Sequence, residues 1–273
     1  MSESGGQTRV RLIGLPTDSH SSFLRGAADA PPAIRAALAS NHSNMAAECG
    51  LDVAEDLHFE DAGDLPLDES RADADRIRNA AAQAARDGAV PIFLGGDHMV
   101  TFPIVSGISA ERGPIAILHF DAHPDLYDDF EGDPLSHASP FARIMENKLA
   151  SRLVQVGIRT ANGHCREQAA RFGVETVEMR AFTPDRVPIP DGPLYISIDM
   201  DALDPAFAPG VSHHEPGGLS VRDILSVLDR VRGPLIGADI VEYNPRRDVN
   251  GMTAVVAAKL VKEIAALAAR GKQ

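Results

Sequence analysis

The sequence predicts an α/β fold, in which a largely parallel β-sheet is covered by helices on both faces. One observation predicts this fold, and a second predicts that it forms a single domain. Short apolar runs typical of buried strands alternate along the chain with alanine-rich or periodically apolar segments typical of helices. No linker-like boundary, low-complexity tract or internal repeat divides the 273 residues. We therefore predict a single domain that spans residues 1–273.

In the first half of the chain, proline and glycine mark where helices begin and end. Pro31 and Pro32 open the first helix, because proline is tolerated in a first turn. Gly88 ends an alanine-rich helix, and Pro103 lies in the first turn of the next one. Strands are predicted over residues 10–15, 57–62, 90–94 and 115–118, and helices over 33–39, 69–87 and 100–108.

The second half continues the alternation, interrupted by two loops rich in Pro and Gly, the first of them also in Asp, at 124–135 and 204–218. The closing helix carries Val256, Leu260 and Ile264 at helical spacing, which predicts a buried stripe. Strands are predicted over residues 153–157, 174–179, 194–198 and 235–241, and helices over 138–149, 163–172, 221–231 and 252–269.

Composition argues against several classes of protein. The chain has 39 acidic against 26 basic residues, a net charge of −13, which disfavours a nucleic-acid or anionic-membrane partner. No apolar run has the length of a membrane span, and the amino terminus lacks the order of a secretory signal. Cys49 and Cys165 are the only cysteines, so neither a disulfide framework nor a thiolate metal site is indicated. We expect a cytoplasmic protein.

Acidic and imidazole side chains directly follow four of the predicted strands. They are His98 after residues 90–94, Asp121, His123 and Asp125 after 115–118, Asp199 and Asp201 after 194–198, and Glu242 after 235–241. The carboxyl ends of parallel strands share one edge of a sheet, where ligand sites lie. The i, i+2, i+4 spacing of the second group would point its three side chains the same way on an extended chain. We expect all of these groups to meet in one crevice.

Six of these side chains are good ligands for a divalent metal: His98, Asp121, His123, Asp125, Asp199 and Asp201. Four converging carboxylates would repel one another without cations, whereas two divalent ions would match their charge. The sequence therefore predicts a two-metal centre, with the ions about 3.5–4 Å apart. Ligands without cysteine disfavour structural zinc and favour Mn²⁺, with Ni²⁺, Co²⁺ and Fe²⁺ as alternatives. Such a centre supplies a hydroxide near neutral pH, so we expect hydrolysis.

With these residues in place, the chain resembles the ureohydrolases, the arginase/agmatinase family, and looks closest to the plant-type arginases. Four motifs carry the resemblance: Gly-Gly-Asp-His at 95–98, Asp-Ala-His-Pro-Asp at 121–125, Ser-Ile-Asp-Met-Asp-Ala-Leu-Asp-Pro at 197–205 and Glu-Tyr-Asn-Pro at 242–245. Segments 136–144, 206–213 and 251–254 look like the plant branch. The resemblance implies a three-layer α/β/α fold, two Mn²⁺ ions per subunit, and trimers or hexamers. It also implies that a metal-bridging hydroxide cleaves a guanidino compound to urea and an amine, with L-arginine favoured and agmatine a close second.

The resemblance also implies roles for single residues. His98, Asp121, Asp125 and Asp199 would hold one ion, and His123, Asp121, Asp199 and Asp201 the other. His137 looks like the family's proton-shuttle histidine, with an exposed loop histidine as the alternative. Glu242 looks like the guanidinium anchor, with a carboxylate paired to Arg246 or Arg247 as the alternative. Asp97 and Asp204 belong to the motifs but are expected to be structural.

Two segments depart from the family pattern. The loop at residues 127–135 differs from that of animal arginases, where the amino-acid end of the substrate is gripped. Where agmatinases often carry Thr-Gly-Thr-Pro, this chain has Val-Ser-His-His at 211–214. Because the loop at 127–135 differs, the way in which animal arginases recognise the α-carboxylate of the substrate does not carry over to this chain. His213 and His214 are open to three roles, which are pocket lining, binding of a stray metal and an ordinary loop role.

Three alternatives to arginine or agmatine hydrolysis stay open at this stage. The same chemistry could act on guanidinobutyrate or formimidoylglutamate. A dinuclear amidohydrolase or deacylase would act on a neutral amide, for which the anionic Glu242 is not needed. A non-catalytic binding protein could keep the fold, but the intact ligand set argues against it.

Overall fold

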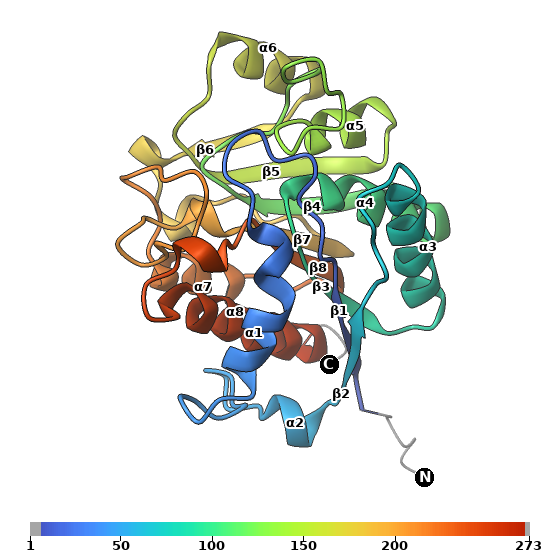
Figure 1. The fold of residues 1–273 in the computed structure, drawn as a ribbon, viewed down its shortest axis with the longest axis vertical. Helices are drawn as coiled ribbons and strands as arrows, with labels where there is room; N and C mark the ends of the chain where they lie inside the picture. The colour runs from blue at the N-terminus through green and yellow to red at the C-terminus, as the bar shows by residue number, and fades with distance from the viewer. Residues whose placement is uncertain (1–6, 271–273) are drawn as a thin grey trace.

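A parallel β-sheet forms the middle of the molecule in the computed structural model, which describes residues 7–270 (Figure 1). Its eight strands lie in the order β2-β1-β3-β8-β7-β4-β5-β6, and every neighbouring pair is parallel. The strands are β1 Arg9–Gly14, β2 His58–Asp64, β3 Val90–Leu94, β4 Ile115–Phe120, β5 Ala150–Ile158, β6 Glu175–Glu178, β7 Leu194–Asp199 and β8 Leu235–Val241. The predicted parallel α/β sheet is confirmed.

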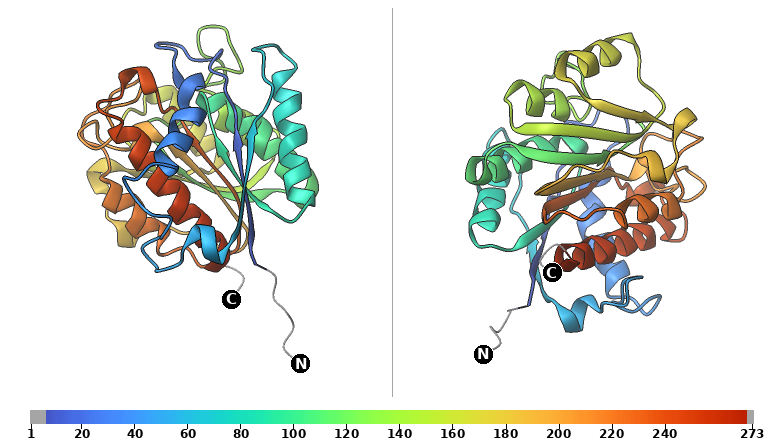
Figure 2. Two further views of the ribbon diagram at one scale, coloured as in Figure 1. Left: turned by 60° about the horizontal axis from the view of Figure 1, so that its bottom comes forward. Right: turned by 180° about the vertical axis from the view of Figure 1, so that it is seen from behind.

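Helices cover both faces of this sheet, which makes three layers (Figure 2). Helices α1, α7 and α8 pack on one face, and α3, α4 and α5 on the other. The helices are α1 Ala30–Leu38, α2 Val53–Asp56, α3 Asp73–Arg86, α4 Thr101–Arg112, α5 Pro140–Glu146, α6 Gly163–Phe172, α7 Val221–Leu228 and α8 Met252–Arg270. The three-layer arrangement is the one that the family resemblance implies.

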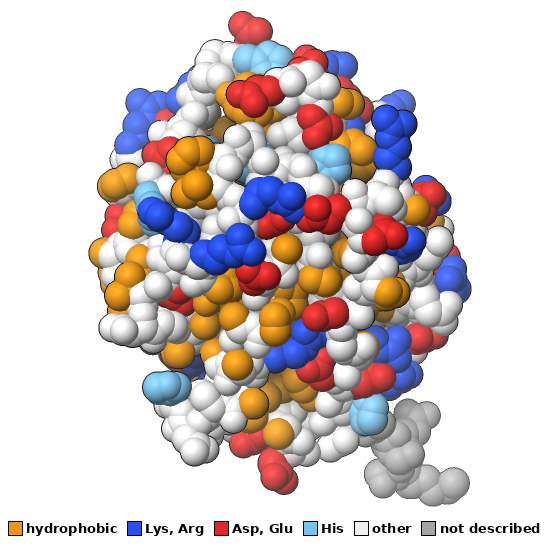
Figure 3. Space-filling view, in the orientation of Figure 1, with side chains coloured by type: hydrophobic (Ala, Val, Ile, Leu, Met, Phe, Trp, Pro, Cys, Tyr) orange, Lys and Arg blue, Asp and Glu red, His pale blue; other side chains and the backbone are white. Residues whose placement is uncertain are grey.

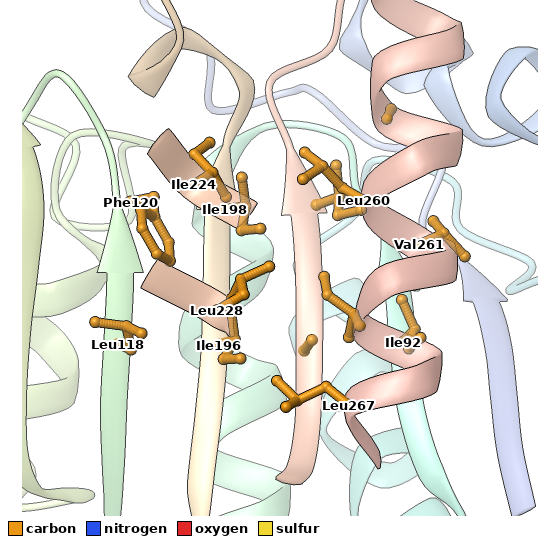
Figure 4. Close-up of a cluster of buried hydrophobic side chains, with 14 of the residues drawn as sticks. Ile92, Leu118, Phe120, Ile196, Ile198, Ile224, Leu228, Leu260, Val261 and Leu267 are labelled. Atoms are coloured by element: carbon orange, nitrogen blue, oxygen red, sulfur yellow. The ribbon is translucent and has the colours of Figure 1, made fainter. Parts of the chain in front are cut away.

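The core is divided by the sheet into two apolar clusters. Because side chains alternate along a strand, Leu118 and Phe120 of β4 face α7 and α8, whereas Ile117 faces the other helical layer. Figure 4 shows the first cluster, where Ile196 and Ile198 of β7 lie among helix side chains. Strands β4 and β7 are buried on both faces, which explains why their sequences are nearly continuous apolar runs.

Three helices are shorter in the structure than the sequence predicts, and one of them is α7, which ends at Leu228 and not at residue 231. The helix expected from residue 69 begins at Asp73, whose carboxylate accepts the backbone N–H groups of Asp68 and Glu69 at 3.1 and 2.8 Å. This contact holds the preceding residues in a turn. The helix expected over 138–149 ends at Glu146, and Lys148 adopts a left-handed conformation with φ of 54°. The short α2 was not predicted.

The central four strands set the place of the candidate site. Strands β7 and β8 are inserted between β3 and β4, and the carboxyl ends of all four strands lie within one residue of a single register row. Leu94 pairs with Ile240, Ile240 with Ile198, and Ile198 with Phe120. The segments that leave these four carboxyl ends are therefore neighbours, as expected for a ligand site in a parallel sheet.

The surface that carries α1 mixes both signs of charge. Figure 3 shows basic and acidic side chains next to one another on this face. Ion pairs of this kind include Arg246 with Asp29 at 2.9 Å and Arg35 with Asp61 at 2.8 Å. Within residues 7–270, no helix is long and apolar enough to cross a membrane.

Candidate metal centre and substrate pocket

His98 lies at the centre of a group of buried carboxylates. Its Nδ1 atom is 3.2 Å from Asp121 Oδ2, 3.0 Å from Asp125 Oδ2 and 3.1 Å from Asp199 Oδ2. All four side chains are buried. The structure thus brings together residues that follow three different strands, β3, β4 and β7.

The hydrogen bonds behind His98 assign its tautomer. Ser197 donates its hydroxyl hydrogen to Asp239 at 2.7 Å, so the same oxygen accepts a hydrogen from His98 Nε2 at 3.1 Å. The Nδ1 atom then presents a lone pair to the carboxylates, and it is a buried nitrogen that makes no hydrogen bond. A lone pair facing three anionic oxygens is repulsive unless a cation lies between them. This donor set fits a divalent metal ion.

His123 forms a second group beside the first. Its Nδ1 atom lies 3.1 Å from Asp201 Oδ2 and 3.4 Å from Asp121 Oδ1. Asp121 therefore turns one carboxylate oxygen to His98 and the other to His123. A carboxylate shared in this way suits a pair of neighbouring cations. Asp121, His123 and Asp201 form one of the residue groups within residues 7–270 that could hold a metal ion.

The backbone around Asp121 is not the extended chain that the i, i+2, i+4 spacing suggested. Strand β4 ends at Phe120, and the N–H of His123 donates to Asp121 Oδ1 at 2.6 Å, which makes a tight turn. Asp125 has a left-handed backbone with φ of 50°, and this conformation directs its carboxylate to His98. The three side chains converge through turns and not through strand alternation, so that part of the prediction is wrong.

A glycine turn places His98. The N–H groups of Gly96 and Asp97 donate to backbone carbonyls of Leu15 and Thr17 at 3.2 and 3.1 Å. A Cβ atom on Gly96 would lie 1.8 Å from the carbonyl oxygen of Thr17, so only glycine fits there. This close contact between two strand ends holds the start of the His98 segment.

Burial and like charge act together on the carboxylates. Burial raises the pKa of Asp199 well above its ordinary value, and the charges of Asp201 and Asp121 add to this rise. Burial also raises the pKa of Asp125, again with a contribution from Asp121. Both shifts are the cost of gathering anions away from water, which bound cations would offset.

His119, which the sequence reasoning missed, supports this group from β4. It also lies within ligand distance of His98 and Asp121, so these three residues form another group that could hold a metal. However, its Nδ1 accepts a hydrogen from Gln155 at 3.2 Å, so its Nε2–H donates to Asp121 Oδ2 at 2.9 Å. This arrangement makes His119 a support for the Asp121 carboxylate. As the fifth residue of the apolar strand β4, it gave no pattern that set it apart.

Glu242 and His137 form a buried pair beside the carboxylates. His137 Nδ1 lies 2.9 Å from Glu242 Oε1, and the same oxygen accepts the backbone N–H of His98 at 2.9 Å. The other ring nitrogen of His137 lies 2.8 Å from the hydroxyl of Ser22, a residue that none of the sequence motifs includes. Glu242 has a left-handed backbone with φ of 61°.

The alternatives for these two residues do not match the structure. His137 is buried and not an exposed loop histidine. Arg246 pairs with Asp29 at 2.9 Å, and among residues 7–270 neither Arg246 nor Arg247 forms an ion pair with Glu242. Burial opposes the His137 cation, but the charge and hydrogen bond of Glu242 outweigh it and raise the pKa of His137 to about 9.

Asp97 and Asp204 hold loops, as expected. Asp97 is fully buried and accepts the backbone N–H groups of His20 and Met99 at 2.9 and 3.2 Å. Burial, together with the charge of Glu242, raises the pKa of Asp97 to about 7. Asp204 accepts three backbone N–H groups of its own loop, those of residues 206, 217 and 218.

A pocket of about 280 Å³ opens onto this group of residues. Aromatic and imidazole rings form much of its wall, including Tyr127, Phe130 and His213. The ring of His213 lies 5.4 Å from that of His137 and 5.9 Å from that of His123, so His213 takes the pocket-lining role left open above. His214 points elsewhere, with Nε2 2.7 Å from the carbonyl of Pro209.

Comparison with known proteins gives one consistent result. The family model described as the arginase family matches residues 8–266. Arginase 1, mitochondrial, of Arabidopsis thaliana is 50% identical over 96% of this chain and 82% of its own length. Agmatinase, mitochondrial, of Gallus gallus is 34% identical over 93% of this chain and 79% of its own length. The solved structure of arginase from Medicago truncatula superposes with a TM-score of 0.91 at 46% identity, covering 97% of this chain and 89% of that one.

The expectation of a cytoplasmic protein is wrong. The plant arginases to which this chain is similar are named as mitochondrial, or as chloroplastic and mitochondrial, enzymes, which points to an organelle. The expectation rested on the two cysteines and on composition. Neither property distinguishes a cytoplasmic protein from a protein inside an organelle, because proteins without a disulfide framework occur in both places.

Proposed function

Because the chain belongs to the arginase family and is a ureohydrolase, we propose that it cleaves L-arginine to urea and an amine with two Mn²⁺ ions per subunit. The observation that carries this proposal is the buried lone pair of His98 facing three carboxylates, with Asp121 shared between two ligand groups. Arginine stands before agmatine because identity to the plant arginase exceeds identity to the agmatinase, 50% against 34%.

The residues that would hold the ions divide into two sets that share Asp121 and Asp199. The first set is His98, Asp121, Asp125 and Asp199, and the second is His123, Asp121, Asp199 and Asp201. Carboxylate and imidazole ligands without thiolate suit Mn²⁺. When bound, such a pair of ions supplies Lewis acidity and lowers the pKa of a water molecule to near neutral.

Glu242 and His137 would act on the substrate itself. The carboxylate of Glu242 lines the pocket and suits a guanidinium, whose planar N–H groups pair with carboxylates in a fork. His137 carries a proton at neutral pH, since its pKa is raised to about 9, and can give that proton to the departing amine. Substrate binding would have to release Glu242 from its present pairing with His137 or use its second oxygen.

The test is release of urea by the purified, Mn²⁺-loaded protein. Arginine, agmatine and guanidinobutyrate are assayed for urea, and formimidoylglutamate for formamide. Turnover of arginine with the highest kcat/KM supports the proposal, and activity on none of these compounds overturns it. Glu242→Gln should abolish guanidine turnover, while a variant that still cleaves a neutral amide would favour an amidohydrolase.

Two further properties stay predictions. We propose that the protein forms trimers or hexamers, as the family resemblance implies, and that residues 1–273 form a single domain. Light scattering coupled to size-exclusion chromatography measures the first, and a single calorimetric unfolding transition in the presence of Mn²⁺ supports the second.

A further inference from the structure

Glu215 lies at the mouth of the same pocket, on the loop between β7 and α7. Its carboxylate is 3.8 Å from Nε2 of His123, and its side chain is 36% exposed. Arg159 donates to its backbone carbonyl at 2.9 Å from Nε and 2.6 Å from Nη2. The same guanidinium donates to the carbonyl of Asp201 at 2.7 Å. The loop is therefore held against the metal-binding segment, and the position of Glu215 is fixed relative to the site.

Glu215 and Glu242 stand at opposite ends of a row of imidazole rings. Glu242 contacts His137, the ring of His213 lies between those of His137 and His123, and Glu215 approaches His123. Glu242 is at the buried end, with its side chain 5% exposed, and Glu215 is at the solvent end. A substrate that places one group at Glu242 can therefore extend its other end along this row toward Glu215, since both residues line the same pocket.

The charge of the pocket decides what that other end can be. Among residues 7–270, no Lys or Arg lines the pocket, whereas five acidic residues do: Asp125, Asp199, Asp201, Glu215 and Glu242. Divalent ions would neutralise the Asp side chains, and a guanidinium would neutralise Glu242. Glu215 is then left with a charge that neither partner compensates. A partly desolvated anion attracts an ammonium group and repels a carboxylate.

We propose that Glu215 is a specificity-determining residue that binds the amine at the far end of the substrate. It would select guanidino compounds that carry such an amine over guanidino acids that end in a carboxylate alone. This inference rests on the proposed function, since it assumes that a guanidinium occupies the inner end. The α-carboxylate of arginine would meet neutral donors such as Tyr127, whose hydroxyl oxygen accepts a hydrogen from Asn162 at 2.7 Å and keeps its own hydrogen free to donate.

The experiment compares wild-type protein with Glu215→Gln and Glu215→Asp, all loaded with Mn²⁺, on arginine, agmatine and 4-guanidinobutyrate. A charge-assisted hydrogen bond is worth roughly ten- to a hundredfold in affinity, and the exposure of Glu215 places the effect near the lower end. We expect Glu215→Gln to raise KM for arginine and agmatine about tenfold with a smaller change in kcat. KM for 4-guanidinobutyrate should stay the same or fall, and Glu215→Asp should recover part of the loss.

The matched control is Glu131→Gln, which removes the same charge from an exposed loop residue that does not line the pocket. It should leave all three KM values within twofold of the wild type. The inference is overturned if Glu215→Gln changes the three substrates equally, or changes arginine and agmatine no more than the control does.

Binding of product analogues separates this inference from the proposed function. Calorimetry on the Mn²⁺-loaded protein measures putrescine, which has two amines, and 4-aminobutyrate, which has a carboxylate at one end. Glu215→Gln should weaken putrescine about tenfold and remove its advantage over 4-aminobutyrate. If the wild type turns over no guanidine, the proposed function fails, and this binding difference alone then supports or overturns the role of Glu215.

Discussion

Replacing Asp239 with Asn should weaken metal binding although Asp239 contacts no candidate ligand directly. Its fully buried carboxylate accepts three hydrogen bonds, from Ser197 at 2.7 Å on one oxygen, and from Tyr195 and Thr101 at 2.7 and 3.0 Å on the other. Through Ser197 it assigns the tautomer in which Nδ1 of His98 is a free acceptor. An amide cannot accept on both sides, because one oxygen becomes an NH₂ group.

Either orientation of the new amide has a cost. With its NH₂ toward Ser197, the hydroxyl hydrogen turns to His98, and the ring proton moves to the nitrogen that should face the metal. With its NH₂ toward Thr101 and Tyr195, two buried hydroxyls lose their acceptor, at about 1–3 kcal/mol each. Loss of such a supporting contact lowers metal affinity by about 10- to 100-fold, which is about 1.4–2.8 kcal/mol.

The assay is competition between the apoprotein and a fluorescent chelator for Mn²⁺, with thermal unfolding measured in parallel. Thr101→Val is the matched control, because it removes one donor from the other oxygen and leaves the bond from Ser197 intact. It should lower stability but keep Mn²⁺ affinity within about twofold. The reasoning is refuted if Asp239→Asn binds Mn²⁺ as tightly as Thr101→Val does.

Three other predictions concern the pair beside the metal centre, the glycine turn and the ions. Glu242→Gln should lower the pKa of His137 from its raised value of about 9, since Glu242 is the strongest of the groups that oppose burial; NMR titration of the metal-free protein measures it, and an unchanged value contradicts the assignment. In the wild type the raised pKa means that the pair stabilises the fold fully below pH 6.5 and loses this contribution as the pH rises through about 9. Gly96→Ala should destabilise the protein by about 2–3 kcal/mol in urea unfolding, because its Cβ would meet the carbonyl of Thr17; wild-type stability would show that the turn can shift. Removing Mn²⁺ with a chelator should lower Tm by several degrees, because the buried carboxylates lose the positive charge that compensates them, and adding Mn²⁺ back should restore Tm. An unchanged Tm would argue against the two-metal centre.

Strands were the most predictable part of this fold. Strands β4 and β7 are buried on both faces, so each appears in the sequence as an apolar run that needs no knowledge of its neighbours. Helix starts were less predictable, because the start of α3 depends on a contact between the side chain of Asp73 and preceding backbone. The strand order could not be read from the sequence, since it depends on which edges pair in three dimensions.

The candidate site divides in a similar way. Its six proposed ligands could be found because each lies at the end of an apolar strand or within five residues after it, and such ends meet at one edge of a parallel sheet. Asp239 and His119 were missed because they lie inside strands, where only the tertiary structure shows which side chain they touch. Ser22 was missed because it lies on a loop far from the motifs. Glu215 was missed because only the tertiary structure shows that this residue of the 204–218 loop lines the pocket.

The insertion of β7 and β8 between β3 and β4 has a consequence for biosynthesis. Of these four strands, β3 and β4 are synthesised first. Strands β7 and β8, which lie between them in the sheet, are synthesised near the end of the chain. In a growing polypeptide, the segments that carry His98 and Asp121 are therefore not held together by the central strands of the sheet until residue 241 has left the ribosome. Capture of the ions would be among the last events of maturation, and it would mark a finished subunit.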